Sequence, residues 1–516
     1  MPIRFVGVCF VIAAAGLTVV GAQQPNPSQP GTKHRTHDIP TRGSFSNVLR
    51  TEPRARPQID TSGRSLDRPQ LWATEPSTGA QYRRGQVLVK FRLNADTAAR
   101  SRAIQSAGGG RVVRALPASW NVVELQDTAD PMQSVRALRA RAEVISASLN
   151  YRRRPHQVQP NDELYTLQWN FPAINMPQAW QINPGARSEV IVAVIDTGTN
   201  TVTDTVVYVS PFVGQIPVRV AEVPDLVTPG RIVSPRDFVY NDDLPVDLDG
   251  HGTHVAGTIA QQTNNNIGLA GVAYNVRLMP IKALAADWDF IFLSDPGGTD
   301  VDIAAAIRYA ADNGAKVINM SLGGPGDSPI LQDALNYAVS RGAFIAISAG
   351  NSGDEDNEED FPAAYAEDIR GVMAVGAVNR DLRHAPYSTF HSYVEICAPG
   401  GETLVAFDYE RGVTQVTYDF GATLAFLDFT EKFAALLDGE RPAFDQFEAV
   451  PFQGTSMAAP HVSGVAALLY SQGITNPGAI EEAIRRSAMP INATTEQCGS
   501  GLVDARRALR GLGLGR

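Results

Sequence analysis

Three polar side chains in this sequence have the types and settings that a nucleophilic site requires. Asp196 ends the apolar run "VIVAVID", His251 opens the stretch "HGTHVAGT", and Ser456 lies in "GTSMA". A serine hydroxyl becomes a nucleophile when a base takes its proton, and a histidine serves as that base when an acid fixes its tautomer. Each residue alone is weak evidence, because serines and aspartates also cap helices and end strands. The three contexts together point to one site.

The segments around these residues indicate a parallel α/β domain. From about residue 185, short apolar runs alternate with helical patterns, and "EVIVAVIDTG" is typical of a strand buried on both faces. Strand–helix alternation predicts a doubly wound, mostly parallel sheet with helices on both faces. Sites in such sheets lie at the carboxyl ends of the strands, which is where Asp196 stands. The predicted sheet can therefore gather the three residues.

The motifs that carry these residues resemble those of a known family. "VIDTG", "GHGTHVAGT", "SAGN" and "GTSMAAPHV" are similar to the four motifs of the subtilisin-like serine proteases (subtilases), and they occur in that family's order. The similarity runs from about Asn161 to Asp504 and is strongest for secreted bacterial members of the thermitase type. It implies a subtilisin-like fold and a secreted serine endopeptidase that acts on protein or peptide substrates.

The resemblance also implies roles for single residues. Asp196 would orient the imidazole, His251 would act as general base and then general acid, and Ser456 would attack the peptide carbonyl. Asn351, in "SAGN", would stabilise the oxyanion together with the backbone N–H of Ser456. The segment "SLGG" matches the family's substrate-pairing stretch, with three residues that would bind substrate: Ser321, Leu322 and Gly323.

The acidic segment "DEDNEEDFPAAY" contains a residue that could set substrate preference. It matches the stretch that closes the first specificity pocket in this family, and Asp360 precedes Phe361 and Pro362 within it. A carboxylate there would widen the preference toward substrates with a basic or polar residue before the cleaved bond. A solvated acidic loop and a second cation site are the alternatives.

A structural calcium ion is a further implication of the resemblance. "TNNNIG" matches a family loop that wraps Ca²⁺, a cation that prefers several oxygen ligands. By motif position the ligands would be Asp162, Asp204, the side chain of Asn265, and the backbone carbonyls of Thr263, Ile267 and Leu269. Residues 199–236 depart from the family pattern, and an asparagine-rich turn without an ion is the alternative reading.

The N-terminal part of the chain predicts export and control. Residues 1–22 contain an early arginine, an apolar run and small residues, as a secretory signal peptide does; a membrane anchor is the alternative. Residues 23–80 are rich in Pro, Arg, Ser and Gln and are expected to be flexible. Residues 81–155 show the strand and helix patterns of a small α+β unit that resembles the ferredoxin-like propeptides of the family, which assist folding and inhibit the enzyme.

The catalytic domain would then span residues 160–516, with the propeptide cut off within about residues 155–162. Charge changes at the same boundary: residues 23–160 carry a net charge of about +12 and residues 161–516 about −23, within a total of −10. Opposite charges favour association of a propeptide with its enzyme. Nucleic-acid binding by the basic part is disfavoured, because its arginines are scattered and not interleaved with aromatic residues.

Two features and two rival functions stay open at this level. Cys397 and Cys498 could form a disulfide or remain two thiols. An insertion at about residues 402–450 could form a wall or lid near Ser456, or a remote scaffold. A silent relative used as a binding module would have lost a catalytic residue, and none is lost. A lipase-like hydrolase would show a GxSxG motif and the order Ser-Asp-His.

Overall fold

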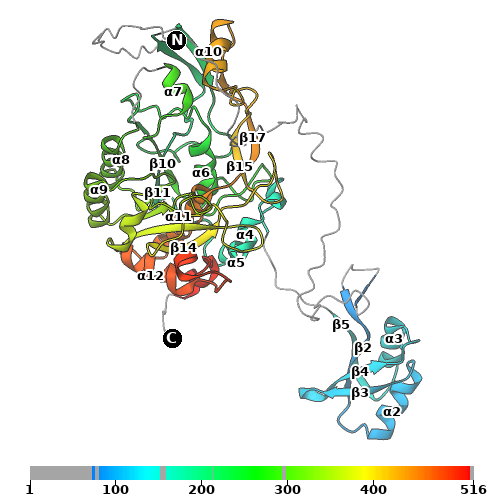
Figure 1. Ribbon diagram of the computed structural model, residues 1–516. Helices are drawn as coiled ribbons and strands as arrows, with labels where there is room; N and C mark the ends of the chain where they lie inside the picture. Colours follow the sequence, from blue (N-terminus) through cyan, green and yellow to red (C-terminus); the bar gives the residue numbers. More distant parts are fainter. Residues whose placement is uncertain (1–71, 76–80, 152–158, 212, 293–297, 512–516) are drawn as a thin grey trace, which may run out of the picture. The chain divides into compact units, whose positions relative to one another are not determined.

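The computed structural model describes residues 72–75, 81–151, 159–211, 213–292 and 298–511 (Figure 1). The predicted signal peptide at 1–22, most of the segment at 23–80 and part of the predicted cleavage window lie outside the described residues. The chain divides near residue 157 into two compact units, and each is described by itself.

The N-terminal unit is an antiparallel sheet with two helices, in which β2 to β5 follow the order βαββαβ and the short β1 adds to β2. In the sheet, β5 and β4 flank β2, and β3 pairs with the far side of β4. The elements are β1 (Trp72–Thr74), β2 (Gln81–Phe91), α2 (Thr97–Ser106), β3 (Gly110–Ala115), β4 (Trp120–Leu125), α3 (Pro131–Arg139) and β5 (Val144–Tyr151). Alternate residues of β2, namely Val87, Val89 and Phe91, are fully buried, as expected for a sheet with one covered face. The arrangement is the predicted ferredoxin-like one.

The C-terminal unit is built on a seven-stranded sheet in which every neighbouring pair is parallel. The order across the sheet is β14, β13, β12, β11, β6, β10, β9. The strands are β6 (Ile191–Asp196), β9 (Arg236–Asp237), β10 (Arg277–Lys282), β11 (Val317–Met320), β12 (Phe344–Ser348), β13 (Val372–Val378) and β14 (Val394–Pro399). The chain passes from β10 to β11 on the other side of β6, so the strand order reverses there. A binding site is expected at this point.

Helices cover both faces of the sheet, which confirms the predicted doubly wound fold. Because successive strand residues point to opposite faces, Val192 and Val194 join the core on one face, and Ala193 and Ile195 join the core on the other. The first core holds α4 (Asn170–Ala173), α5 (Met176–Ala179), α6 (His251–Ala260), α11 (Thr455–Ser471), α12 (Pro477–Ser487), α13 (Thr495–Cys498) and α14 (Ala505–Arg510); the second holds α8 (Asp300–Asp312) and α9 (Pro329–Ser340). Among the described helices, none has the length and apolar character needed to cross a membrane.

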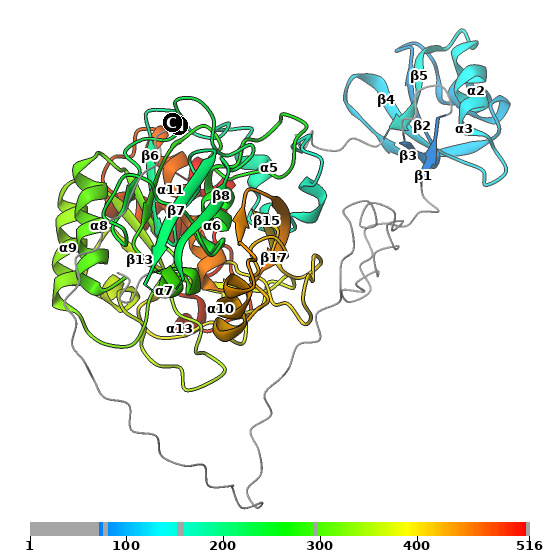
Figure 2. The same cartoon turned by 90° about the horizontal axis from the view of Figure 1, so that it is seen from above.

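The insertion packs at two places. Its first and last parts form an antiparallel hairpin, β15 (Val413–Tyr418) with β17 (Phe447–Phe452), and β15 packs against α6. Its middle part holds α10 (Phe429–Leu437) and β16 (Ala443–Phe444), and β16 pairs with the hairpin of β7 (Asp204–Ser210) and β8 (Gly214–Val220). Together with α7 (Asp287–Phe292) these elements bury a separate apolar cluster, called the satellite cluster below. Figure 2 shows α7 beside one end of β7, with α10 next to α7.

Cys397 and Cys498 form a disulfide, which decides between the two states that the sequence left open. The bond joins β14 to α13 near the end of the chain. Backbone hydrogen bonds reinforce the connection, since Cys397 N–H donates to Gly501 O (2.9 Å) and Val503 N–H donates to Cys397 O (2.9 Å). The C-terminal segment is therefore fastened to the edge strand of the sheet.

Candidate active site

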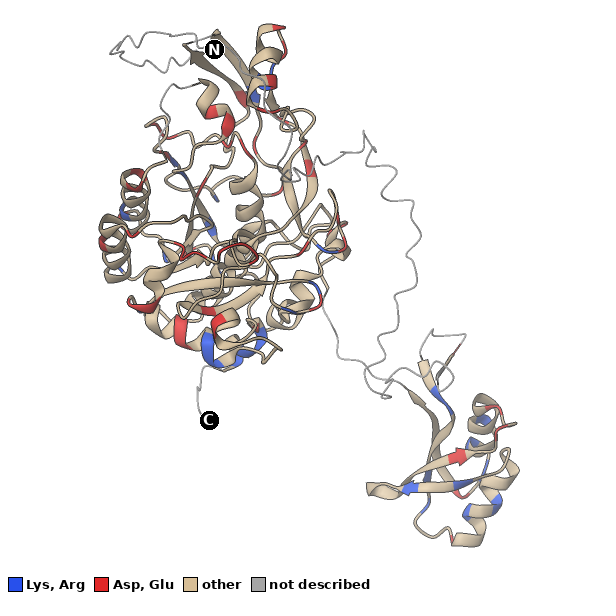
Figure 3. Cartoon of the chain, in the orientation of Figure 1, with Lys and Arg blue, Asp and Glu red and all other residues tan. Residues whose placement is uncertain are grey.

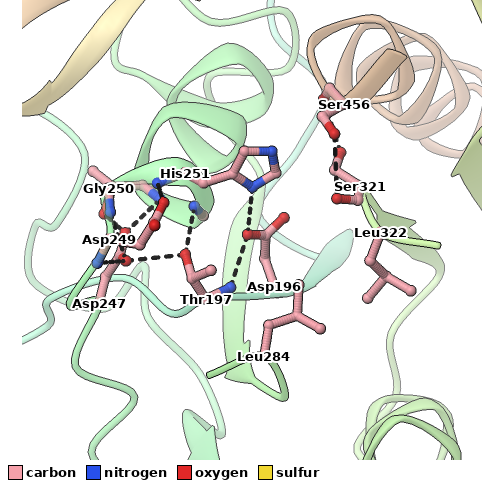
Figure 4. A network of polar contacts seen from close by, with 12 residues as sticks. Asp196, Thr197, Asp247, Asp249, Gly250, His251, Leu284, Ser321, Leu322 and Ser456 are labelled. Atoms are coloured by element: carbon pink, nitrogen blue, oxygen red, sulfur yellow. Dashed lines mark hydrogen bonds and ion pairs between the residues drawn. The ribbon is translucent and has the colours of Figure 1, made fainter. Parts of the chain in front are cut away.

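Asp196 and His251 form a hydrogen-bonded pair at the carboxyl end of the central strand. Asp196 is the last residue of β6 and is fully buried, and His251 is the first residue of α6. The Nδ1 atom of His251 lies 2.7 Å from Oδ1 of Asp196, which also accepts the Thr197 N–H at 2.7 Å (Figure 4). An acid in this position fixes the tautomer that leaves Nε2 free to accept a proton.

Electrostatics at this pair favours the charged imidazole. Burial by itself lowers the pKa of His251, but the charge of Asp196 and its hydrogen bond outweigh burial and raise the pKa to about 9. Asp249 and Asp247 add to the increase. The side chain of His251 keeps 26 % of its surface exposed, so the ring can be reached from solvent while its acid partner cannot.

Asp247, which the sequence analysis did not single out, organises the start of α6. Its buried carboxylate accepts hydrogen bonds from the N–H groups of Asp249, Gly250 and Thr253 and from the hydroxyls of Thr197 and Thr253, all between 2.6 and 3.0 Å. A carboxylate satisfies the free N–H groups of a helix N-terminus and interacts well with its dipole. An acid four residues before the histidine at a helix start was the available signal.

A close backbone approach brings α6 against the end of β6. Gly252 donates its N–H to Thr197 Oγ1 at 2.9 Å, and a Cβ atom on Gly252 would lie 2.4 Å from the carbonyl oxygen of Gly198. Any larger residue would push the helix away from the strand end. This glycine of "HGTHV" therefore allows His251 to reach Asp196.

Ser456 stands at the start of α11, beside the end of β11. Its hydroxyl donates to Ser321 O at 3.4 Å, and the Ser321 hydroxyl donates to Ser456 O at 2.8 Å. In the view of Figure 4, the ring of His251 lies between Asp196 and Ser456. Among the described residues, the Ser456 hydroxyl bonds the Ser321 carbonyl, and no hydrogen bond joins it to His251.

Asn351 is held so that its amide N–H groups are available. The side-chain oxygen of Asn351 accepts the N–H and the hydroxyl of Thr455, each at 2.9 Å. Thr455 directly precedes Ser456, and Gly454 before it has a φ of 146°, which favours glycine. The amide is thus tied to the backbone next to the nucleophile, with its nitrogen side turned away from that bond.

The substrate-binding residues expected from "SLGG" lie against Asp360. The backbone of Gly324 pairs with that of Phe361 (N···O 3.0 and 2.8 Å), and a Cβ on Gly323 would lie 1.8 Å from Oδ1 of Asp360. Gly350 borders the same carboxylate from the other side. Gly323 and Gly350 therefore flank the carboxylate of Asp360, and Ser321 and Leu322 directly precede Gly323.

The carboxylate of Asp360 has no cationic neighbour. Its Oδ1 is buried without a hydrogen-bond partner, and the backbone N–H of the residue donates to the Tyr393 hydroxyl at 3.1 Å. Burial raises the pKa of Asp360 to about 7. A partly buried carboxylate without a partner gains free energy when a cation or a hydrogen-bond donor reaches it.

Some of the residues that were expected to hold calcium lie close together. Asp162 is buried and accepts the N–H groups of Asn264 (2.9 Å) and Asn265 (3.1 Å). Asn265 also bonds through its side chain to Asp225. The loop turns back through Asn264 and Asn266, both with positive φ. None of the carbonyls of Thr263, Ile267 and Leu269 accepts a backbone hydrogen bond from the described residues.

Asp204, which was expected in this set, has no hydrogen bond to Asp162 or Asn265 among the described residues. It begins β7, its side chain is exposed, and its carboxylate accepts the N–H of Thr205 at 2.7 Å. It pairs with Val220 in the hairpin of β7 and β8, which belongs to the satellite cluster. Asp225 is the second carboxylate beside Asn265; burial first, and then the charge of Asp162, raise its pKa to about 6. The short "PDL" stretch after the hairpin was the missed signal.

The carboxylates of Asp162 and Asp225, the amide of Asn265 and three carbonyls make a donor set that suits Ca²⁺. The positive charge would offset the repulsion between Asp162 and Asp225. The described residues therefore fit the implied ion, with Asp225 in place of Asp204.

Comparison with known proteins agrees with this geometry. The sequence profile of the subtilase family matches residues 187–503, and the profile of the fervidolysin N-terminal prodomain matches residues 70–150. Over 83 % of its length the chain is 32 % identical to a thermophilic serine proteinase of Bacillus sp. (strain AK1), of which 88 % is covered. Over 68 % of its length it is 33 % identical to thermitase of Thermoactinomyces vulgaris, of which 99 % is covered.

Solved structures are similar as well. Fervidolysin from Fervidobacterium pennivorans, described as a keratinolytic enzyme related to subtilisin, is 26 % identical with a TM-score of 0.52, and the match covers 85 % of this chain and 62 % of that one. A protease from Pseudoalteromonas arctica is 31 % identical with a TM-score of 0.53, over 68 % of this chain and 99 % of that one.

Proposed function

The chain belongs to the subtilase family of serine proteases and carries a fervidolysin-like N-terminal prodomain, and from this premise we propose that it is a secreted endopeptidase that works through Asp196, His251 and Ser456. The observation that carries the proposal is the 2.7 Å contact between Asp196 and His251. It joins two motifs that are 55 residues apart and leaves Nε2 of the histidine available to Ser456.

In the proposed reaction, Nε2 of His251 takes the proton of Ser456 while Oγ attacks the peptide carbonyl. The tetrahedral oxyanion accepts hydrogen bonds from the side-chain amide of Asn351 and from the backbone N–H of Ser456. His251 then gives its proton to the leaving amine, and water hydrolyses the acyl-enzyme by the same steps in reverse roles. Asp196 keeps the imidazole oriented and stabilises its charged form throughout.

The substrate is proposed to bind as an extended strand along Ser321, Leu322 and Gly323. The side chain before the cleaved bond would approach Asp360. A lysine or arginine would place its charge near the unpartnered Oδ1 atom, which supports a preference for basic or polar residues at this position.

The prodomain is proposed to act as an intramolecular inhibitor that is cut off within residues 155–162. The charges support this, since Lys and Arg outnumber Asp and Glu in the N-terminal part and the reverse holds after residue 160 (Figure 3). Export by a signal peptide at 1–22 fits an extracellular or periplasmic location. A bound Ca²⁺ would stabilise the fold by joining Asp162, Asp225 and the loop at 263–269.

The test compares the exported chain (residues 23–516) with its Ser456→Ala variant by mass spectrometry over time, in the presence of Ca²⁺. We expect the parent protein to lose its front piece near residue 157, while Ser456→Ala stays whole. Ser471→Ala, at the end of the same helix, is the matched control and should process normally. If the parent protein stays whole and cleaves no peptide, the proposed activity is wrong and a binding role gains support.

A further inference from the structure

Lys282 is a fully buried lysine directly beside the Asp196–His251 pair. It is the last residue of β10 and stands opposite Asp196 in the strand register. Its ammonium donates to Thr197 O (3.0 Å), Leu284 O (3.2 Å) and Asp289 Oδ2 (2.9 Å). All three N–H donors of the side chain are thus used, and none of its surface is left to solvent.

Two of these bonds hold backbone carbonyls of residues that themselves contact Asp196. Thr197 follows Asp196 directly, and its N–H and hydroxyl bind Asp196 and Asp247. Leu284 donates its N–H to the carbonyl oxygen of Asp196 at 3.2 Å. By fixing the carbonyls of Thr197 and Leu284, the ammonium of Lys282 fixes the segment that presents the Asp196 carboxylate to His251.

The third bond, to Asp289, connects Lys282 to a helix that the insertion contacts. Asp289 lies on α7, is fully buried, and also accepts the Tyr240 hydroxyl (2.8 Å) and the Ala286 N–H (2.6 Å). Next to it, Trp288 Nε1 donates to Thr423 O of the insertion at 3.1 Å. Lys432 on α10 binds Asp287 at 2.9 Å and lies over the Trp288 ring. The insertion therefore holds the start of α7, the helix that carries Asp289.

We propose that Lys282 is a positioning residue for the Asp196–His251 pair, and that the insertion acts on catalysis through it by holding α7 and Asp289. The inference rests on the proposed peptidase activity. It gives the 402–450 insertion a task at the catalytic centre without contact with substrate. The alternative is that the buried pair and the satellite cluster only stabilise the fold.

A burial argument favours the positioning role. A buried ion pair is seldom more stabilising than apolar residues of the same size, because both charges lose their hydration. Stability alone does not explain a lysine at this strand end. Apolar side chains, however, could not bind the carbonyl oxygens of Thr197 and Leu284 in one fixed geometry.

The test is a double-mutant cycle in the full chain. The variants are Lys282→Met, Lys432→Met, and the two combined; Arg308→Met, which breaks an exposed ion pair with Asp333 on α9, is the control. Variants that mature slowly are processed with a trace of tagged parent enzyme, which is then removed. Active sites are titrated with a phosphonate inhibitor, and kcat, KM and Tm are measured on a peptide anilide.

For Lys282→Met we expect kcat per titrated site to fall about ten- to a hundredfold with KM changed less than about twofold, because the pair is misplaced while substrate binding is intact. Lys432→Met should lower kcat about two- to fivefold, and this effect should vanish in the Lys282→Met background. Arg308→Met should leave kcat unchanged.

Several outcomes would overturn the inference. A normal kcat in Lys282→Met with a lowered Tm assigns the lysine to stability alone. An undiminished Lys432 effect in the double variant means that the insertion does not act through Lys282. If Lys282→Met does not fold, Asp289→Asn and Lys432→Met carry the test, and normal kcat in both refutes it. A parent enzyme without activity would instead contradict the proposed function.

Discussion

Replacing Asp360 with asparagine removes the charge of this side chain and leaves its size and shape nearly unchanged. The carboxylate lies against Gly323 and Gly350, with Oδ1 buried and unpartnered. Because no cation is present, burial raises the pKa of Asp360 to about 7. A substrate lysine or arginine would be the missing counter-charge, so Asp360→Asn should lower the preference for such substrates.

The size of the effect follows from the strength of a partly buried charge pair. Two unit charges 4 Å apart attract by ~4 kcal/mol at an effective dielectric constant of about 20. Desolvation of the incoming cation offsets part of this, and hydrogen bonds to charged groups typically contribute about 1.5–3 kcal/mol. At ~1.4 kcal/mol per factor of ten, the ratio of kcat/KM for an arginine substrate to that for a phenylalanine substrate should fall about ten- to a hundredfold.

The assay measures kcat/KM for two peptide anilides that differ only in arginine or phenylalanine before the cleaved bond, at pH 8.5 and pH 6. The titration of His251 affects both substrates equally and cancels in the ratio. At pH 6 the Asp360 carboxyl is mostly protonated, so the arginine preference of the parent enzyme should approach that of Asp360→Asn. Glu359→Gln, on the exposed part of the same loop, is the control and should change the ratio little.

Stability gives an independent check with a defined sign. The pKa of Asp360 is higher in the folded chain (about 7) than its usual value of 3.8, so the folded state binds the proton more tightly. The free energy of unfolding should therefore decrease as pH rises from about 4 to about 7, and Asp360→Asn should remove that part of the decrease. Equal or faster cleavage after phenylalanine by the parent enzyme, or an unchanged ratio in Asp360→Asn, would refute the reasoning.

Further predictions concern the oxyanion, the ion, the disulfide and the general base. Asn351→Leu should lower kcat about 10²- to 10³-fold with little change in KM, measured on a peptide anilide; a normal kcat excludes its proposed role. Asp225→Asn should reduce the rise in Tm that Ca²⁺ gives, whereas Asp204→Asn should leave it intact, and the reverse result would restore the sequence-based assignment. Replacing Cys397 and Cys498 with serine opens a closed loop with a sequence separation of 101 and should cost about 2–5 kcal/mol in a urea titration; an unchanged midpoint would contradict this. Finally, kcat/KM should still increase with pH above 6.5, the ordinary pKa of histidine, since the pKa of His251 is raised. If kcat/KM instead reaches its plateau below pH 6.5, Asp196 does not stabilise the charged imidazole.

The fold class could be predicted because its signals are local. Apolar runs such as "VIVAVID" are buried on both faces, so the parallel sheet is evident from composition and spacing. The candidate site could be predicted for a similar reason. The glycines and small residues around His251 and Ser456 permit close backbone approaches that few other residues allow. The motifs around these two residues can therefore be identified from the sequence.

The ligand set and the insertion could not be predicted in the same way. Asp204 and Asp225 are both aspartates in a region without a clear motif, and only the pairing of β7 with β8 shows which of them faces Asn265. The partners of Trp288 and Lys432 lie more than 130 residues away in the chain. Such contacts depend on how the elements pack, and residue type alone does not reveal them.

The sequence by itself therefore determined the sheet, the order of its elements and the three residues proposed to react, because these depend on periodicity and on short segments. The tertiary structure decided which carboxylates lie together, whether the two cysteines bond, and what surrounds Asp360 and Lys282. These depend on distances between residues remote in the chain. The free energy of a buried charge is set by the neighbours that the fold brings to it, and so the chemistry of these sites was settled by packing.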